Sequence, residues 1–182
     1  MPIAIITGNA RKFEELRDLL APIKVEQVNL ALDEIQELDA KKIIEHKLEL
    51  ASRLHGGECM VEDSALYLEA LNGFPGPLVK WFEDSLGLPK IAEIAKALGN
   101  TRATVETTIG YSNGKGQFKF FTGTLTGQIV EPRGEKDFGY GAIFVPNGHS
   151  KTFGEMERAE KHILSMRAQA AQKLKQHLLH SL

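Results

Sequence analysis

Residues 3–12 read IAIITGNARK, and this stretch changes from strand-like to helix-like within a few positions. The apolar, β-branched run Ile3–Ile6 predicts a buried strand that stops at Gly8. Asn9 then stands where an N-cap is expected, and apolar side chains follow it at helical spacing (Phe13, Leu16, Leu19 and Leu20). The stretch therefore predicts a β-strand that turns through glycine into a helix.

Such a turn directs the free backbone N–H groups of the helix N-terminus toward one point. Lys12 adds a full positive charge in the first helical turn. Backbone donors, the helix dipole and a cation together suit a phosphate group. The alternative is an ordinary strand-to-helix turn with a solvated lysine, and this element alone leaves both interpretations open.

Length and composition predict a single domain over residues 1–182. A chain of this length buries about 70% of its unfolded surface, and its 42% hydrophobic and 25% charged residues are ordinary for a globular protein. The net charge of −2 argues against a nucleic-acid partner, and there is neither a signal-peptide pattern nor an apolar run of ~20 residues for a membrane. Cys59 is the sole cysteine, so we expect a packed thiol and a cytoplasmic protein.

The pattern along the chain predicts an α/β fold with an elongated mixed β-sheet flanked by helices. Strands are expected at 23–30, 59–61 and 65–70, and helices at 39–54, at 88–98 and from Ser165 or slightly earlier onward. Two long Thr-, Val- and Phe-rich segments, 103–111 and 117–130, are separated by a Gly-rich loop and predict an antiparallel hairpin. A rigid turn is expected at 72–77.

Glu62 and Asp63 follow an apolar strand, and we expect them at its end, where ligands collect in open α/β sheets. Adjacent side chains on a strand point to opposite faces, so one carboxylate would face a site and the other a structural partner. Carboxylates at this place could bind Mg²⁺ or act as a base toward water. The alternative is a solvated acidic turn. Glu34 is a further candidate oxygen ligand, or a surface residue.

Two lysines stand among apolar or aromatic neighbours. Lys47 lies on a helix face otherwise filled by Ile43 and Leu50, where it either extends to solvent or reaches a buried anion. Lys80 precedes Trp81 and is either a positioned charge or an ordinary loop lysine.

Three further features lie in the second half of the chain. Phe138–Gly139–Tyr140–Gly141 offers aromatic faces with glycines that permit close approach, so a purine could stack there; the alternative is an aromatic strand end with a bulge. Lys161, Ser165 and Arg167 cluster before the last helix, where basic groups suit an anion better than they suit the helix. Met166 lies on that helix's apolar stripe and is typical of packing.

Several catalytic and cofactor motifs are absent from the sequence. It contains no GxxxxGK[ST], GxGxxG or HExxH motif and no paired cysteines at metal-ligand spacing. Zinc-dependent and dinucleotide-dependent functions are therefore not indicated.

The ordered segments 7–12, 61–64, 71–77, 138–140 and 159–161, with Ser165 and Arg167, resemble the inosine/xanthosine triphosphate pyrophosphatase family. The resemblance spans nearly the whole chain. It implies two lobes with a central nucleotide cleft, and usually a homodimer. It also implies Mg²⁺-dependent hydrolysis of deaminated purine nucleoside triphosphates (ITP, dITP, XTP) to the monophosphate and pyrophosphate.

The resemblance further assigns roles to residues of this chain. Asp63 would activate water and hold the metal together with Glu34. The phosphates would be held by Thr7, Gly8, Asn9, Ala10, Arg11, Lys12, Lys47 and Lys80. Phe138 would stack on the base, and Lys161 and Arg167 would contact its edge. The further nucleotide-binding residues expected are Gly139, Tyr140, Gly141 and Met166.

Two positions depart from the family pattern, and both belong to the base-binding residues. Gly141 stands where the family usually has Asp, and Met166 where it usually has His. We therefore expect a weaker preference for inosine and xanthosine triphosphates over ATP and GTP than is usual. The competing hypothesis is a nucleotide-binding protein of the same fold with altered base specificity or little turnover.

Overall fold

The computed structural model describes residues 1–180 and shows a mixed α/β fold, as predicted. Its strands are β1 (Ile3–Ile6), β2 (Val25–Val28), β3 (Cys59–Leu68), β4 (Pro75–Gly76), β5 (Arg102–Ser112), β6 (Phe118–Ile129) and β7 (Phe144–Pro146). Its α-helices are α1 (Ala10–Leu20), α2 (Ala40–His55), α3 (Val79–Leu86), α4 (Leu88–Ala97), α5 (Arg158–Leu164) and α6 (Met166–His180). The 3-10 helices η1 (Glu69–Leu71) and η2 (Gly139–Ile143) complete the described elements.

The strands form a mixed sheet, which confirms the predicted sheet type. Their hydrogen-bonded order is β2-β1-β3-β5-β6-β7, and β4 pairs with β3 outside this path. β1 runs parallel to both β2 and β3, whereas β4 is antiparallel to β3 and β7 is antiparallel to β6. β5 and β6 are neighbours joined by the Gly-rich loop, where the Asn113 N–H donates to the Gln117 carbonyl at 3.2 Å.

The chain divides into two compact units, and β3, β5 and β6 each contribute residues to both. Unit 1 consists of Met1–Asp63, Thr107–Gly123 and the segment from Met166 onward. Unit 2 consists of Ser64–Glu106 and Thr124–Ser165. That residues 1–182 fold as a single domain stays a prediction.

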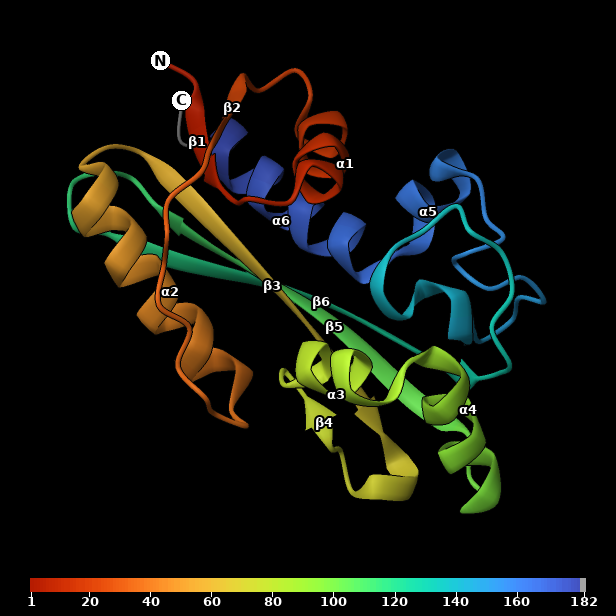
Figure 1. Cartoon of the computed structure of the whole chain (residues 1–182). Coiled ribbons are helices and arrows are strands. Elements are labelled where there is room, and N and C mark those ends of the chain that lie inside the picture. The colour runs from red at the N-terminus through yellow and green to blue at the C-terminus, as the bar shows by residue number, and fades with distance from the viewer. Residues whose placement is uncertain (181–182) are drawn as a thin grey trace. The chain divides into compact units, whose positions relative to one another are not determined.

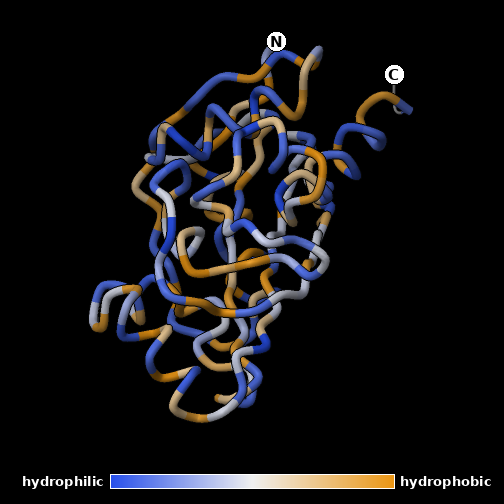
Figure 2. The backbone as a smooth tube through the Cα atoms, turned by 90° about the vertical axis from the view of Figure 1, so that its right-hand side faces the viewer, coloured by the Kyte–Doolittle hydropathy of each residue, from blue (hydrophilic) through white to orange (hydrophobic). Residues whose placement is uncertain are grey.

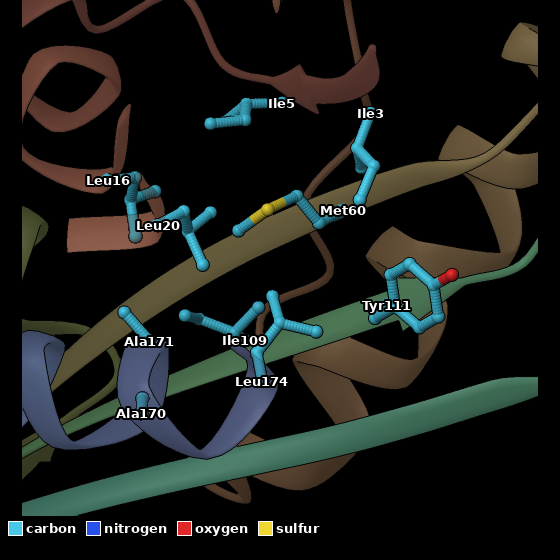
Figure 3. Packing of buried hydrophobic residues seen from close by; sticks show 10 residues of the cluster. All are labelled: Ile3, Ile5, Leu16, Leu20, Met60, Ile109, Tyr111, Ala170, Ala171 and Leu174. Carbon is cyan, nitrogen blue, oxygen red and sulfur yellow. The ribbon is translucent and has the colours of Figure 1, made fainter. Parts of the chain in front are cut away.

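Unit 1 has helices on both faces of its strands. On one face α1 and α6 lie side by side (Figure 1), and their leucines and alanines pack against Ile3, Ile5 and Met60 (Figure 3). On the other face α2 contributes Ile44 and Leu48 to a second cluster of buried side chains. The β3 residues alternate between these clusters, with Met60 in the first and Val61 in the second.

Two glycines allow the helices of unit 1 to approach the strands closely. A Cβ atom at Gly110 would lie 3.2 Å from Leu48, so α2 packs directly on the β5 backbone. A Cβ atom at Gly123 would lie only 2.0 Å from the Met166 carbonyl oxygen, so the start of α6 touches the β6 backbone. Glycine at 123 therefore allows the start of α6, which carries Arg167, to lie against β6.

In unit 2, β4 pairs with β3 after a tight turn in which Asn72 adopts the left-handed conformation (φ 51°). The helices α3 and α4 both contact η2, the short helix that follows Phe138. Phe144 and Phe153 are buried against each other with ring centroids 5.4 Å apart.

Several local expectations prove wrong. β3 does not end at Glu62 and Asp63 but runs unbroken from Cys59 to Leu68, because buried apolar side chains continue on both sides of the acidic pair. Lys80 lies on the helix α3 rather than in a loop. The C-terminal helix is two helices separated at Ser165, so Lys161 does not precede a helix but lies within α5.

Hydrophobic stretches along the backbone are short and alternate with hydrophilic ones (Figure 2). Among the described residues, no helix combines the length and apolar character needed to cross a membrane.

Candidate active site

The turn between β1 and α1 is built by its own polar side chains. The Asn9 side-chain oxygen caps α1 by accepting the Lys12 N–H at 3.1 Å, as predicted. The Thr7 hydroxyl accepts the Asn9 N–H at 3.1 Å, and the Thr7 carbonyl accepts the Gln27 side chain at 3.0 Å. Gly8, Asn9, Ala10 and Arg11 are exposed, so this helix N-terminus is open to an anion.

Glu62 and Asp63 point to opposite faces of β3, as the strand geometry predicts. Glu62 is only 6% exposed and pairs with Arg167 at 3.3 Å and with Lys12 at 2.9 Å. Arg167 also donates to Glu15 at 2.6 Å, and the three side chains of this Glu15–Arg167–Glu62 network are between 3% and 9% exposed. Glu62 is therefore the structural partner, and Lys12 is held at the edge of a buried ion-pair network.

Asp63 faces α2, where it joins a second charged cluster. Lys47 lies 2.6 Å from a Glu34 oxygen and 4.0 Å from an Asp63 oxygen, and its side chain is only 12% exposed. Of the two outcomes expected for Lys47, the structure therefore has the one in which it reaches anions. Two carboxylates from separate segments converge on a single cation in unit 1.

Opposing forces act on the ionisation of these groups. Burial raises the pKa of Asp63 above its usual value, while the ammonium groups of Lys47 and Lys12 oppose this rise. Burial lowers the pKa of Lys47, but Asp63 and Glu34 outweigh it, so that the pKa of Lys47 is raised overall. Lys47 consequently stays charged at neutral pH and favours the ionised form of Asp63, which a base or a metal ligand requires.

The donor set around Asp63 suits a hard divalent cation. The carboxylates of Glu34 and Asp63 already converge on the ammonium of Lys47, which shows that this point favours positive charge. Among residues 1–180 no group of three or more His, Cys, Asp or Glu side chains is placed to bind a metal. One or two carboxylates completed by water and phosphate oxygens is the usual arrangement for Mg²⁺, whereas zinc sites are usually built from three or four protein ligands that include Cys or His.

In unit 2 the candidate base-binding residues gather around η2 and α5. Phe138 precedes η2, and Gly139 has a left-handed φ of 57°. The Lys161 ammonium lies 5.6 Å from the centre of the Phe138 ring and 2.6 Å from an oxygen of Asp137. Lys161 is itself 5% exposed, so its charge is held in place rather than mobile in solvent.

Glu83 of α3 also contacts this turn. Its carboxylate accepts a hydrogen bond from the backbone of Tyr140 and lies 3.7 Å from the position of a Cβ atom at Gly139. Burial, followed by repulsion from Asp84, raises the pKa of Glu83 to about 7. The turn that carries Phe138 is thus supported by a carboxyl group that titrates near neutrality.

The predicted site residues fall into two groups. Unit 1 brings together the turn that contains Lys12 and the side chains of Glu34, Lys47 and Asp63, while Met166 and Arg167 start α6 in the same unit. Unit 2 contains residues 138–141, Lys161, and an exposed Lys80 on α3. Met166 is 6% exposed, as expected of a packing residue. The roles assigned to all these residues stay predictions.

Sequence reasoning missed two residues that structure the site. Glu15 lies on α1 among apolar positions, and its 7% exposure shows that it is buried with Arg167. Its place on the buried face of an amphipathic helix was the available signal. Asp137 gave no such signal, because only the folded backbone brings it to Lys161.

The comparisons with known proteins cover almost the whole chain. A model of the Ham1 family matches residues 3–177. Inosine triphosphate pyrophosphatase of Schizosaccharomyces pombe is 36% identical over 97% of this chain and 94% of its own length. dITP/XTP pyrophosphatase of Methanopyrus kandleri is 36% identical over 95% of this chain and 94% of its own length.

Solved structures agree on the fold. The Ham1 protein of Staphylococcus aureus matches with a TM-score of 0.85 and 23% identity over 100% of both chains. A HAM1 protein from Coxiella burnetii matches with a TM-score of 0.81 and 24% identity over 99% of both chains. The ordered motifs, the mixed sheet and the near-complete coverage by relatives agree, and the chain belongs to the Ham1 family.

Proposed function

We propose that this protein hydrolyses deaminated purine nucleoside triphosphates, such as those of inosine and xanthosine, to the monophosphate and pyrophosphate. The observation that carries this proposal is the 36% identity, over at least 94% of both chains, to relatives named inosine triphosphate pyrophosphatase and dITP/XTP pyrophosphatase. The convergence of Glu34 and Asp63 on Lys47 supports it independently, because it offers charges of both signs at one place.

In this proposal the residues of unit 1 act on the triphosphate. The open N-terminus of α1 and the ammonium groups of Lys12 and Lys47 bind phosphate oxygens and neutralise their charge. Asp63, whose ionised form the ammonium of Lys47 favours against the effect of burial, accepts a proton from the water that attacks the α-phosphorus, and pyrophosphate leaves. Glu34 and Asp63 are the residues that would hold Mg²⁺, which supplies further neutralisation of phosphate charge when bound.

The residues of unit 2 that we assign to the base are Phe138 and Lys161. The Phe138 ring provides a face for stacking, and the ammonium of Lys161 provides donors for a ring carbonyl oxygen. Arg167, expected at the base edge, donates to Glu15 and Glu62 of its own unit, and we propose for it a supporting role in addition to any base contact.

The test is pyrophosphate release from ITP, XTP, ATP and GTP, with and without Mg²⁺. We expect Asp63→Asn to lower kcat by at least about 100-fold, the contribution of a positioned base, while nucleotide binding largely persists. Asp33→Asn is the matched control, because Asp33 is an exposed acid beside Glu34. Wild-type turnover in Asp63→Asn would reject Asp63 as base and ligand.

The nucleotide panel also separates the competing hypothesis. Wild-type protein that binds nucleotides tightly but releases no pyrophosphate would be a binding protein, and the proposed hydrolysis would be rejected. Release that is unaffected by removal of Mg²⁺ with a chelator would reject the metal assignment while leaving the hydrolysis intact.

We further propose that the protein acts as a homodimer, on the basis of the family resemblance, and that it is cytoplasmic, because its single cysteine, Cys59, is buried and forms no disulfide. Light scattering coupled to gel filtration should give the mass of two chains. The mass of a single chain at assay concentration would reject the dimer.

A further inference from the structure

A neighbouring carboxylate lies where a side chain at residue 141 would begin. A Cβ atom at residue 141 would lie 2.2 Å from one oxygen of Asp137, 2.6 Å from its carboxyl carbon and 2.7 Å from its Cβ atom. Real Cβ atoms do not approach other atoms so closely, so the Asp137 side chain occupies the space of the missing side chain at 141. The φ of Gly141 lies outside the left-handed region, so steric fit rather than backbone conformation requires glycine here.

The same carboxylate holds Lys161. The other Asp137 oxygen accepts from the Lys161 ammonium at 2.6 Å, and both side chains are 7% exposed. The ammonium also lies 5.6 Å and 5.8 Å from the ring centres of Phe138 and Phe153. A carboxylate and two aromatic faces thus determine where the charge of Lys161 sits.

We propose that Asp137 and Gly141 form one positioning unit that directs Lys161 toward the base and thereby sets base selectivity. This inference rests on the proposed function. Asp137 supplies from residue 137 the carboxylate that the family resemblance places at residue 141. The change at 141 is therefore compensated, and the weakened selectivity expected from the sequence is to be sought at Met166 rather than at Gly141.

The chemistry of the bases explains why this position matters. Hypoxanthine and xanthine present a carbonyl oxygen at position 6, whereas adenine presents an amine there. An ammonium group is a donor only, so it hydrogen bonds the oxygen and leaves the amine without a partner. This discrimination requires the ammonium to be held at one point, and Asp137 with Gly141 holds it.

The experiment compares kcat/KM for ITP with kcat/KM for ATP in four variants. Asp137→Asn removes the charge but keeps the shape, and Gly141→Ala displaces the carboxylate without changing any charge. We expect each to lower the ITP/ATP ratio by about 10- to 100-fold, the usual range for a hydrogen bond to a charged group. Gly141→Asp alone should do the same, because two carboxylates cannot share the space.

The decisive variant is the exchange Asp137→Gly/Gly141→Asp. It returns a single carboxylate to the space beside Lys161, and we expect the ITP/ATP ratio to recover to within about threefold of wild type, a non-additivity typical of residues in contact. Lys151→Gln is the matched control, because it breaks an exposed ion pair to Glu160 on the same helix α5. The control should leave the ratio unchanged.

The outcomes separate positioning from simple structural support. A purely structural counterion would lower the melting temperature and the kcat/KM of both substrates together, so an unchanged ratio in Asp137→Asn overturns the proposal. An exchange variant no better than the single variants, with folding verified by circular dichroism, also overturns it.

Absence of pyrophosphate release by the wild type would reject the proposed function instead. In that case the ratio of Kd values for ITP and ATP, measured by calorimetry on the same variants, replaces the kinetic ratio. The same changes in that ratio are expected, and a wild type that binds neither nucleotide overturns this inference as well.

Discussion

The buried Glu15–Arg167–Glu62 network predicts a large loss of stability in Arg167→Met. The substitution removes the guanidinium that lies 2.6 Å from Glu15 and 3.3 Å from Glu62, in a place where these side chains are at most 9% exposed. Breaking a buried ion pair by removing one partner costs about 3–5 kcal/mol, because a desolvated charge is left behind. The ammonium of Lys12, 2.9 Å from Glu62, moderates the loss at that carboxylate.

The assay is equilibrium unfolding in urea at pH 7, with thermal unfolding as a second measurement. For a chain of this size a loss of 1 kcal/mol lowers Tm by about 2–4 °C, so Arg167→Met should melt about 6–20 °C below wild type. Adding Glu15→Gln to Arg167→Met should recover part of the loss, since it removes one of the two buried carboxylates that lost the guanidinium.

The matched control is Arg102→Met. Arg102 pairs with Glu69 through two contacts of 2.5 Å and 2.6 Å, but both side chains are more than half exposed. Water solvates the charge that remains when an exposed pair is broken, so the free energy of unfolding of this variant should be close to that of the wild type. Equal losses in Arg102→Met and Arg167→Met, or no recovery on adding Glu15→Gln, would refute the reasoning from burial.

Two further predictions concern stability. Glu83 has a raised pKa of about 7 in the folded protein against 4.5 in the unfolded chain, so its contribution to stability is complete below pH 4.5 and is lost as pH rises to about 7. As pH rises from 4.5 to 8, the free energy of unfolding of Glu83→Gln, which keeps an acceptor for Tyr140, should therefore increase by about 1–2 kcal/mol relative to that of the wild type, a figure reduced for the partial exposure of Glu83. If the unfolding free energies of the two proteins change with pH in parallel, the prediction is wrong. Gly123→Ala places a Cβ atom 2.0 Å from the Met166 carbonyl oxygen, so it should lower the free energy of unfolding, measured in urea, by about 1–3 kcal/mol. An unchanged free energy of unfolding would show that α6 shifts freely.

Local patterns predicted much of the fold. The first strand, the Asn9 cap, α1, α2 and the long hairpin follow from apolar periodicity and from capping residues that act within a few positions of the chain. The opposite orientations of Glu62 and Asp63 also follow from strand geometry alone. Cys59 is fully buried, as expected of a packed thiol, and burial raises its pKa to about 11.

Other elements required contacts between distant segments. β3 continues past Glu62 because ion pairs with Lys12 and Arg167 satisfy a charge that usually marks the end of a strand. α3 was missed because no capping side chain marks its start, where Leu78 stands at the N-cap position.

The sequence by itself determined the α/β class, the family resemblance and the identity of the charged residues, because periodicity, capping and motif order are written in neighbouring positions. The tertiary structure alone decided which charges meet. It placed Arg167 between Glu15 and Glu62, Lys47 between Glu34 and Asp63, and Asp137 in the space left by Gly141. The physical reason is that ion pairing and steric exclusion act over a few ångströms in space, whatever the separation along the chain.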